Sequence, residues 1–152
     1  YEIASCLVGS EMCIRDSNGT VLGCYDGHDS PYFVTDKTIR DKVSSLLPKP
    51  LRTVTAASGD KFVADSATKK FLRETFDADI CEMEIAGICL AAERNEIPVF
   101  SMKVVSDGAD EEATESFGEV LEKGLSKYEE LLPYVLNALS DLKIAPLPPA
   151  TL

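Results

Sequence analysis

Short apolar segments that favour strands alternate with segments that favour helices along most of this chain, and this alternation limits the fold more than any other feature. Strands are predicted over 21–25, 51–57, 79–83 and 99–106. Helices are predicted over 37–47, 66–76, 84–95 and 114–142. Strand–helix alternation of this kind is typical of an α/β fold with a mostly parallel sheet.

Local signals mark where the predicted helices begin and end. Asp36 is suited to begin the first helix, because its carboxylate can accept a hydrogen bond from a first-turn N–H, and Pro48 ends that helix. Asp65 or Ser66 can begin the second helix in the same way. Pro133 is expected to kink or divide the last helix.

One predicted strand, Val99–Ser106, is apolar except at Ser101 and Lys103. Such a run fits a central parallel strand that is covered on both faces. A lysine is unusual there, so Lys103 is expected either to pair with an acidic neighbour or to extend to the edge of the sheet.

The first 17 residues agree poorly with the rest of the chain. The stretch SCLVGSEMCIRDS, Ser5–Ser17, has no helical or strand period and holds two of the five cysteines. It resembles translated adapter sequence that precedes unrelated reading frames. We therefore expect 1–17 to be non-native and leave it out of the fold prediction; the alternative is a genuine but irregular segment. Residues 18–142 are then the C-terminal part of a longer domain, and the Pro-rich residues 143–152 a loose tail.

Charge and composition exclude several classes of partner. The formal net charge is −11, which argues against nucleic acid and acidic membranes because both need a positive surface. No apolar run approaches the roughly 20 residues that cross a bilayer. Five cysteines without paired spacing fit a reducing cytoplasm better than a disulfide framework.

Three polar clusters follow predicted strands: SGDKF at Ser58–Phe62, CEME at Cys81–Glu84, and SDGAD at Ser106–Asp110. In parallel sheets, ligands bind beyond the carboxyl ends of the strands. The sequence therefore predicts that these clusters meet at one edge of the sheet and form an active site.

The residue types in these clusters suggest a polar ligand with a flat apolar part. Glu82 and Glu84 could each accept hydrogen bonds from a vicinal diol, or they could simply favour the positive end of a helix. In a partly dry cleft Asp107 could give a proton to a leaving group, or it could be an ordinary turn residue. Phe62 and Phe117 could enclose a flat ligand, although isolated aromatic residues more often belong to the core. Metal-ligand spacing and phosphate-binding loops are lacking, so no metal or cofactor is expected.

The motifs SGDKFV, CEMEIAGICLAAERNEIPVF and KVVSDGADEEATESF resemble, in order and spacing, the C-terminal half of the nucleoside phosphorylase superfamily. Within it they are most similar to the 5′-methylthioadenosine/S-adenosylhomocysteine nucleosidases. The resemblance covers about Leu51 to Leu139. It implies a phosphorylase/hydrolase-like three-layer fold with a mostly parallel or mixed sheet, of which this chain holds the C-terminal part. It also implies a purine nucleoside substrate, and a homodimeric parent protein.

The resemblance assigns a role to each motif residue. Asp107 is similar to the general acid that protonates adenine N7, and Ser106 to its supporting neighbour. Glu84 resembles the residue that grips the ribose hydroxyls, and Met83 one that packs on the sugar, with Glu82 beside them. The remaining three would contact the base and the 5′ substituent: Phe62 by stacking, Val63 through its backbone, and Phe117 beside the 5′-thio group, where a dimer partner could approach.

The family's water-activating glutamate and glycine-rich segment belong to an N-terminal half that is not found here. We therefore expect the chain as given to be inactive or nearly so. The alternatives are a purine nucleoside phosphorylase, a non-catalytic nucleoside-binding module, and a purely structural α/β domain.

Overall fold

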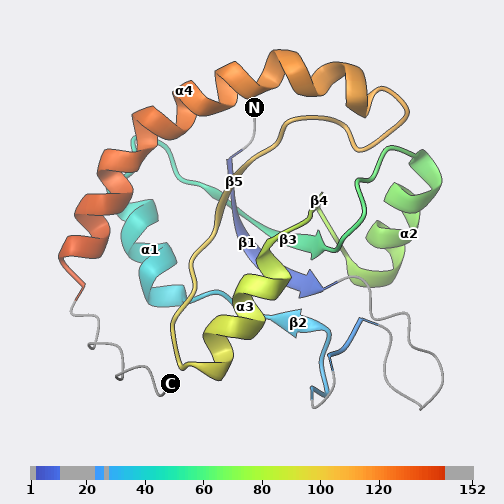
Figure 1. Cartoon of the computed structure of the whole chain (residues 1–152). Coiled ribbons are helices and arrows are strands. Elements are labelled where there is room, and N and C mark those ends of the chain that lie inside the picture. Colours follow the sequence, from blue (N-terminus) through green and yellow to red (C-terminus); the bar gives the residue numbers. More distant parts are fainter. Residues whose placement is uncertain (1–2, 11–22, 26–27, 143–152) are drawn as a thin grey trace, which may run out of the picture.

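A mixed sheet forms the centre of the molecule (Figure 1). The computed structural model describes residues 3–10, 23–25 and 28–142, and for 3–10, 114–119 and 121–123 it describes the backbone alone. Within these residues the sheet has five strands: β1 Ile3–Ser10, β2 Tyr32–Phe33, β3 Arg52–Ser58, β4 Ile80–Glu82 and β5 Met102–Val104. The predicted tail, 143–152, lies outside the described residues.

Strands β1, β3 and β4 are parallel, and the other two run against them. Strand β3 pairs with β1 along its whole length and with β4 near its carboxyl end, where Ser58 lies opposite Glu82. Strands β2 and β5 both pair antiparallel with β1: Val8 lies opposite Phe33, and Ile3 opposite Val104. The carboxyl end of β5 therefore lies beside the amino end of β1.

The four helices of the described chain are α1 Lys37–Leu46, α2 Ser66–Phe76, α3 Ile85–Arg94 and α4 Ala113–Ser140. Each of the first two begins at an aspartate, as predicted. Asp36 Oδ1 accepts a hydrogen bond from Ile39 N at 2.8 Å, and Asp65 Oδ1 accepts one from Thr68 N at 2.7 Å. These bonds satisfy first-turn N–H groups that lack a partner within the helix.

The two faces of β3 pack against different helices, which gives the fold three layers. Val54 and Ala56 pack against α3 through Ile85, Ala86 and Cys89. The next residue, Ala57, points to the other face and belongs to a cluster with residues of α2 and its flanking loops: Val63, Leu72, Phe76 and Ala78. Because successive side chains of a strand alternate between faces, one strand can serve both layers.

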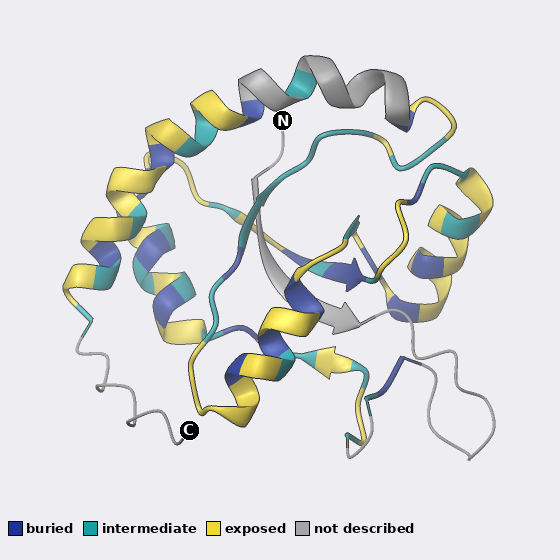
Figure 2. Cartoon of the chain, in the orientation of Figure 1, coloured by how far each residue is buried: buried dark blue, intermediate teal, exposed yellow. Residues whose placement is uncertain are grey.

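A third cluster joins α1 to α4, which arches along one side of the molecule (Figures 1 and 2). Ile39 and Val43 of α1 pack against Leu131 and Ala138 of α4. Helix α4 continues through Pro133, so of the two expected effects of this proline, a kink or a division, the division is wrong.

Two strand predictions and one omission also need correction. Val21–Tyr25 is not a strand in its described part, 23–25, and its other residues lie outside the description. The run Val99–Ser106 forms only the three-residue β5, which is antiparallel rather than central and parallel. Residues Ile3–Ser10, which we left out of the fold prediction, supply the long strand β1. Whether residues 1–17 belong to the natural protein stays a prediction that this strand does not test.

Candidate active site

A cavity of about 360 Å³ opens between α2, β4, β5 and the loop that follows β5. Its lining includes seven of the eight predicted site residues: Phe62, Val63, Glu82, Met83, Glu84, Ser106 and Asp107. The eighth, Phe117, lies in α4, and its side chain is outside the described residues. Asp107 and Glu84 therefore border the same hollow, although they are far apart in sequence.

The way Asp107 reaches this cavity differs from the prediction. The β3 and β4 clusters meet because these strands are parallel and end side by side. Strand β5 is antiparallel, so its carboxyl end does not lead to that edge. Instead, residues 105–112 curve from β5 towards α2 before α4 begins (Figure 1), and this loop carries Asp107 to the cavity.

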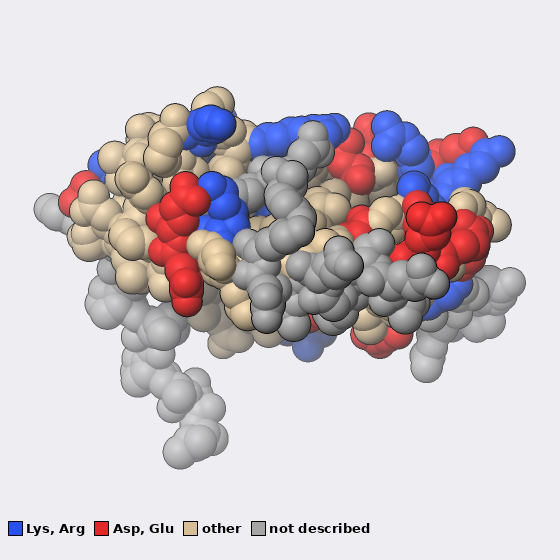
Figure 3. All heavy atoms as spheres, turned by 90° about the horizontal axis from the view of Figure 1, so that it is seen from above, with Lys and Arg blue, Asp and Glu red and all other residues tan. Residues whose placement is uncertain are grey.

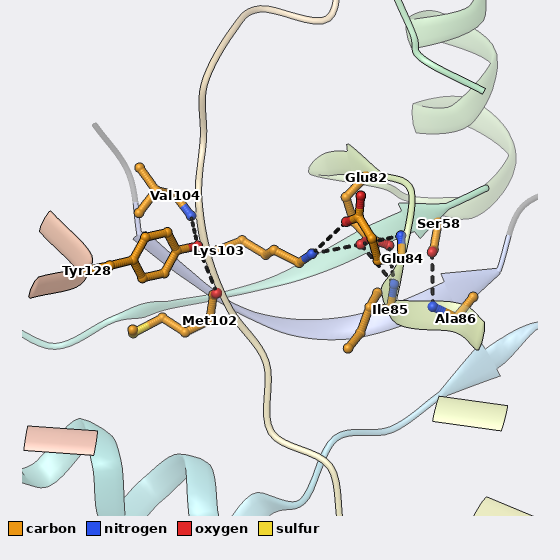
Figure 4. A network of polar contacts seen from close by, with 9 residues as sticks. All are labelled: Ser58, Glu82, Glu84, Ile85, Ala86, Met102, Lys103, Val104 and Tyr128. Atoms are coloured by element: carbon orange, nitrogen blue, oxygen red, sulfur yellow. Dashed lines mark hydrogen bonds and ion pairs between the residues drawn. The ribbon is translucent and has the colours of Figure 1, made fainter. Parts of the chain in front are cut away.

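Glu82, in the cavity wall, binds the start of helix α3 through its side chain. Its Oε2 accepts hydrogen bonds from Glu84 N at 3.0 Å and from Ile85 N at 2.9 Å. Ser58, at the end of β3, accepts a further hydrogen bond from Ala86 N at 3.0 Å (Figure 4). The helix-end interpretation thus holds for Glu82, whose side chain is only 8% exposed.

Lys103 extends from β5 towards both glutamates (Figure 4). Its Nζ lies 2.8 Å from Glu82 Oε2 and 3.2 Å from Glu84 Oε2. The prediction that this lysine pairs with an acidic neighbour is confirmed. Glu84 remains 65% exposed, so Lys103 holds one of its oxygens while the carboxylate stays accessible to a ligand.

The charges of this cluster stabilise one another. Burial alone raises the pKa of Glu82, but hydrogen bonds from Lys103, Ser58 and the backbone outweigh it, and the pKa is lowered. Burial alone lowers the pKa of Lys103, but its bonds to Glu82 and Glu84 outweigh that effect and raise it. Both groups therefore keep their charges across the neutral range.

Asp107 is held by short hydrogen bonds on both of its oxygens. Ser106 Oγ lies 2.7 Å from Oδ2, and Ala109 N donates to Oδ1 at 2.8 Å. The second bond is the turn geometry expected of an aspartate in SDG. The turn does not exclude a role in chemistry, because the carboxyl group still borders the cavity.

Three of the predicted lining residues are apolar, and their exposure differs. Val63 is 5% exposed and packs in the α2 cluster. Phe62 and Met83 are 45% and 42% exposed, which is high for large apolar residues. Their exposure at a cavity fits surfaces that a ligand covers.

Lys103 and Ser58 take part in the polar contacts beside the cavity, and neither was among the eight predicted site residues. The sequence marks Lys103 as unusual, because it is a lysine inside an apolar strand that follows the EME motif. That position was the signal for a role at the site, which the prediction did not assign. Ser58 belongs to the predicted polar cluster SGDKF but was given no role of its own, because a serine at a strand end has many common uses. The described residues contain no group of three or more His, Cys, Asp or Glu side chains arranged for a metal ion.

The family model of the phosphorylase superfamily matches residues 5–137, which is most of the chain. This chain belongs to the phosphorylase superfamily. The superfamily match begins within β1 and includes every predicted site residue.

Individual relatives in the superfamily are nucleosidases. The chain is 36% identical over 125 residues to an aminodeoxyfutalosine nucleosidase of Campylobacter jejuni, over 78% of this chain and 54% of the relative. It is 25% identical over 149 residues to a 5′-methylthioadenosine/S-adenosylhomocysteine nucleosidase of Buchnera aphidicola, over 93% of this chain and 64% of the relative. The chain thus spans about half the length of the first of these relatives and under two thirds of the second.

A solved structure supports the fold. The 5′-methylthioadenosine/S-adenosylhomocysteine nucleosidase of Streptococcus pneumoniae, solved with a transition-state inhibitor, superposes with a TM-score of 0.81 at 24% identity. The match covers 91% of this chain and 62% of that structure. The three-layer phosphorylase/hydrolase-like fold expected from the sequence is confirmed.

Proposed function

We propose that this chain carries the leaving-group and sugar-binding side of a nucleosidase that releases adenine from a 5′-substituted nucleoside. One observation supports this most directly: Asp107, Glu84 and the exposed ring of Phe62 border a single cavity. The family match and the nucleosidase relatives favour the same reaction class.

Cleavage of an N-ribosidic bond builds positive charge on the sugar and negative charge on the base. In our proposal Asp107 protonates N7 of the departing adenine, and Ser106 orients that carboxyl group through its hydrogen bond. General-acid help of this kind is typically worth about a hundred- to ten-thousand-fold in rate.

The sugar would lie beside Glu84 and Met83, which line the same cavity as Asp107. Glu84 accepts hydrogen bonds from the ribose hydroxyls, and its negative charge stabilises the positive charge that develops on the sugar ring. Met83 packs against the sugar. Lys103 and Glu82 fix the position of Glu84 from behind. Phe62 stacks on the base, and the backbone of Val63 holds its edge.

Two classes of substrate are candidates. The motifs favour 5′-methylthioadenosine and S-adenosylhomocysteine, with Phe117 beside the 5′ group. The higher identity to an aminodeoxyfutalosine nucleosidase favours aminodeoxyfutalosine as a second candidate. Comparing adenine release from each by a longer form of the protein would decide between them.

We further propose that the chain as given lacks the residue that activates water and is inactive or nearly so, that its parent is a homodimer, and that it works in the cytoplasm. Measurable adenine release by the purified 152-residue chain would refute the inactivity. Of the described helices, none is both long and apolar enough to cross a membrane.

The decisive variant is Asp107→Asn, tested in a longer form that is active. An enzyme that uses Asp107 as its acid should lose about a hundredfold or more of its turnover while still binding adenine. Glu129→Gln, on the exposed surface of α4, is the matched control and should change neither the turnover nor the binding of adenine. Unchanged turnover in Asp107→Asn would refute the catalytic role, and dependence of cleavage on phosphate would favour a phosphorylase instead.

A further inference from the structure

We propose that Glu111 is a positioning residue: by binding the first turn of α2, it holds the loop 105–112 so that Asp107 borders the cavity. This inference rests on the proposed function of Asp107. It concerns a residue outside the cavity lining, which acts on the chemistry only through Asp107.

The contact between Glu111 and α2 is bidentate. Ser66 N donates to Oε1 at 3.0 Å, and Ser66 Oγ donates to Oε2 at 2.6 Å. Ser66 is the first residue of α2, so the carboxylate lies at the positive end of that helix and satisfies an N–H without a helical partner. The side-chain and backbone hydrogen bonds from Ser66 also lower the pKa of Glu111, which keeps it ionised at neutral pH.

A second contact from the same loop reaches the same helix. Lys69 Nζ, less than one turn further along α2, lies 3.5 Å from Asp110 Oδ2. Two adjacent loop residues thus contact two positions of one helix, which fixes the orientation of the loop better than one contact could. The ion pair is half-exposed and weak by itself, so we assign the main role to Glu111.

The segment between Asp107 and Glu111 is compact enough to transmit this restraint. Asp107 accepts from Ala109 N, and Asp110 Oδ1 accepts from Glu112 N at 3.3 Å. A Cβ atom at Gly108 would lie 2.5 Å from Asp110 Oδ2, so the Asp110 carboxylate lies against Gly108, the residue that follows Asp107. A shift of Glu111 should therefore move Asp107 rather than be absorbed between them.

The topology explains why such a contact is needed. Glu82 and Glu84 follow directly from a strand that is paired within the sheet. Asp107 has no such support, because β5 runs antiparallel to β1. The carboxyl end of β5 therefore lies beside the amino end of β1, away from the carboxyl ends of β3 and β4. The position of Asp107 therefore depends on contacts made by the loop 105–112, and the hydrogen bonds between Glu111 and Ser66 hold this loop against α2.

The first test follows the loop itself and needs no ligand. We would measure hydrogen exchange of the Ser66 and Ala109 amides in the whole chain, in Glu111→Ala and in Glu111→Gln. Losing a charged hydrogen bond should speed both amides by about tenfold in Glu111→Ala. The Gln variant keeps one acceptor and should be intermediate, and Glu129→Gln should match the wild type. Unchanged Ala109 exchange in Glu111→Ala would overturn the proposal.

The second test asks whether Glu111 acts through Asp107. We would measure adenine affinity in wild type, Glu111→Ala, Asp107→Ala and the double variant. Glu111→Ala should weaken binding by about five- to tenfold when Asp107 is present and by less than about twofold when it is absent. Equal losses in both backgrounds would show that Glu111 only supports the fold, and would overturn the proposal.

The two tests separate this inference from the proposed function. If the wild type binds no adenine, the adenine-binding function fails, while the amide exchange still decides whether Glu111 positions the loop. If adenine binds and Ala109 exchange does not respond to Glu111→Ala, the function stands and the positioning role is wrong.

Discussion

The ammonium group of Lys103 lies 2.8 Å from the carboxylate of Glu82, at a place where the Glu82 side chain is only 8% exposed. The same carboxylate holds the first turn of α3, so one ion pair joins an edge strand, a strand end and a helix. This cluster determines where Glu84 lies relative to the cavity.

Replacing Lys103 with Met should destabilise the fold, because Glu82 would keep its buried charge without its partner. We expect a loss of about 2–3 kcal/mol in the free energy of unfolding, measured with urea. Lys127→Met is the matched control, since its pair with Glu130 is exposed and should be worth about 0.5 kcal/mol or less. Similar losses in both variants would contradict a structural role for the buried pair.

Stability should fall in acid because of Glu82. Its pKa is lowered in the folded state, so its ionised form stabilises the fold above the ordinary value of 4.5, and this contribution disappears as pH falls through the lowered pKa. Unfolding free energies from pH 7 to pH 3 should therefore converge for wild type and Glu82→Gln. A constant difference between the two proteins over this range would be inconsistent with the lowered pKa.

Phe62→Ala should weaken adenine binding by about tenfold, since stacking of a base on an aromatic ring contributes about 1–3 kcal/mol. Stability should change little, because the ring is 45% exposed. Phe71→Ala is the control: Phe71 is equally exposed, at 46%, but lies outside the cavity lining. Calorimetric titration with adenine measures the difference, and equal affinities in the two variants would remove Phe62 from the site.

Tyr128→Phe should loosen the contact between α4 and β5. The Tyr128 hydroxyl accepts from Val104 N at 3.1 Å and donates to Met102 O at 3.2 Å. Losing both bonds should cost about 1–2 kcal/mol in urea unfolding. Tyr134→Phe alters a more exposed tyrosine of the same helix and should be close to neutral; if it costs as much, the hydroxyl of Tyr128 has no special role.

The helices were predictable because their signals are local. Asp36 and Asp65 begin α1 and α2 with the hydrogen bonds that their positions suggested. Apolar residues at helical spacing, such as Ile39 and Val43, form the buried faces. The strand β3 and the short strand β4 were also found within one or two residues, since apolar β-prone runs between turns identify them.

The strands that were missed or wrongly placed are defined by the strands they pair with rather than by their own residues. Strand β1 lacks a clear period and was left out of the fold prediction as non-native sequence, yet it lies between β3 on one edge and β2 and β5 on the other. Strand β2 has only two residues, Tyr32 and Phe33, and is defined by its pairing with β1. The direction of β5 could not be read from an apolar run, because parallel and antiparallel strands can share that composition.

The sequence alone determined the family, the helix positions and seven of the residues that line the cavity, because these follow from motifs and short-range spacing. Only the tertiary structure decided how those side chains meet. It showed that Glu82 and Glu84 differ, because Glu82 binds the start of α3 while Glu84 is exposed, and it showed that both pair with Lys103. It also brought Asp107 to the cavity by a loop fastened to α2 instead of by a strand end, since contacts between residues 45 positions apart leave no trace in local sequence.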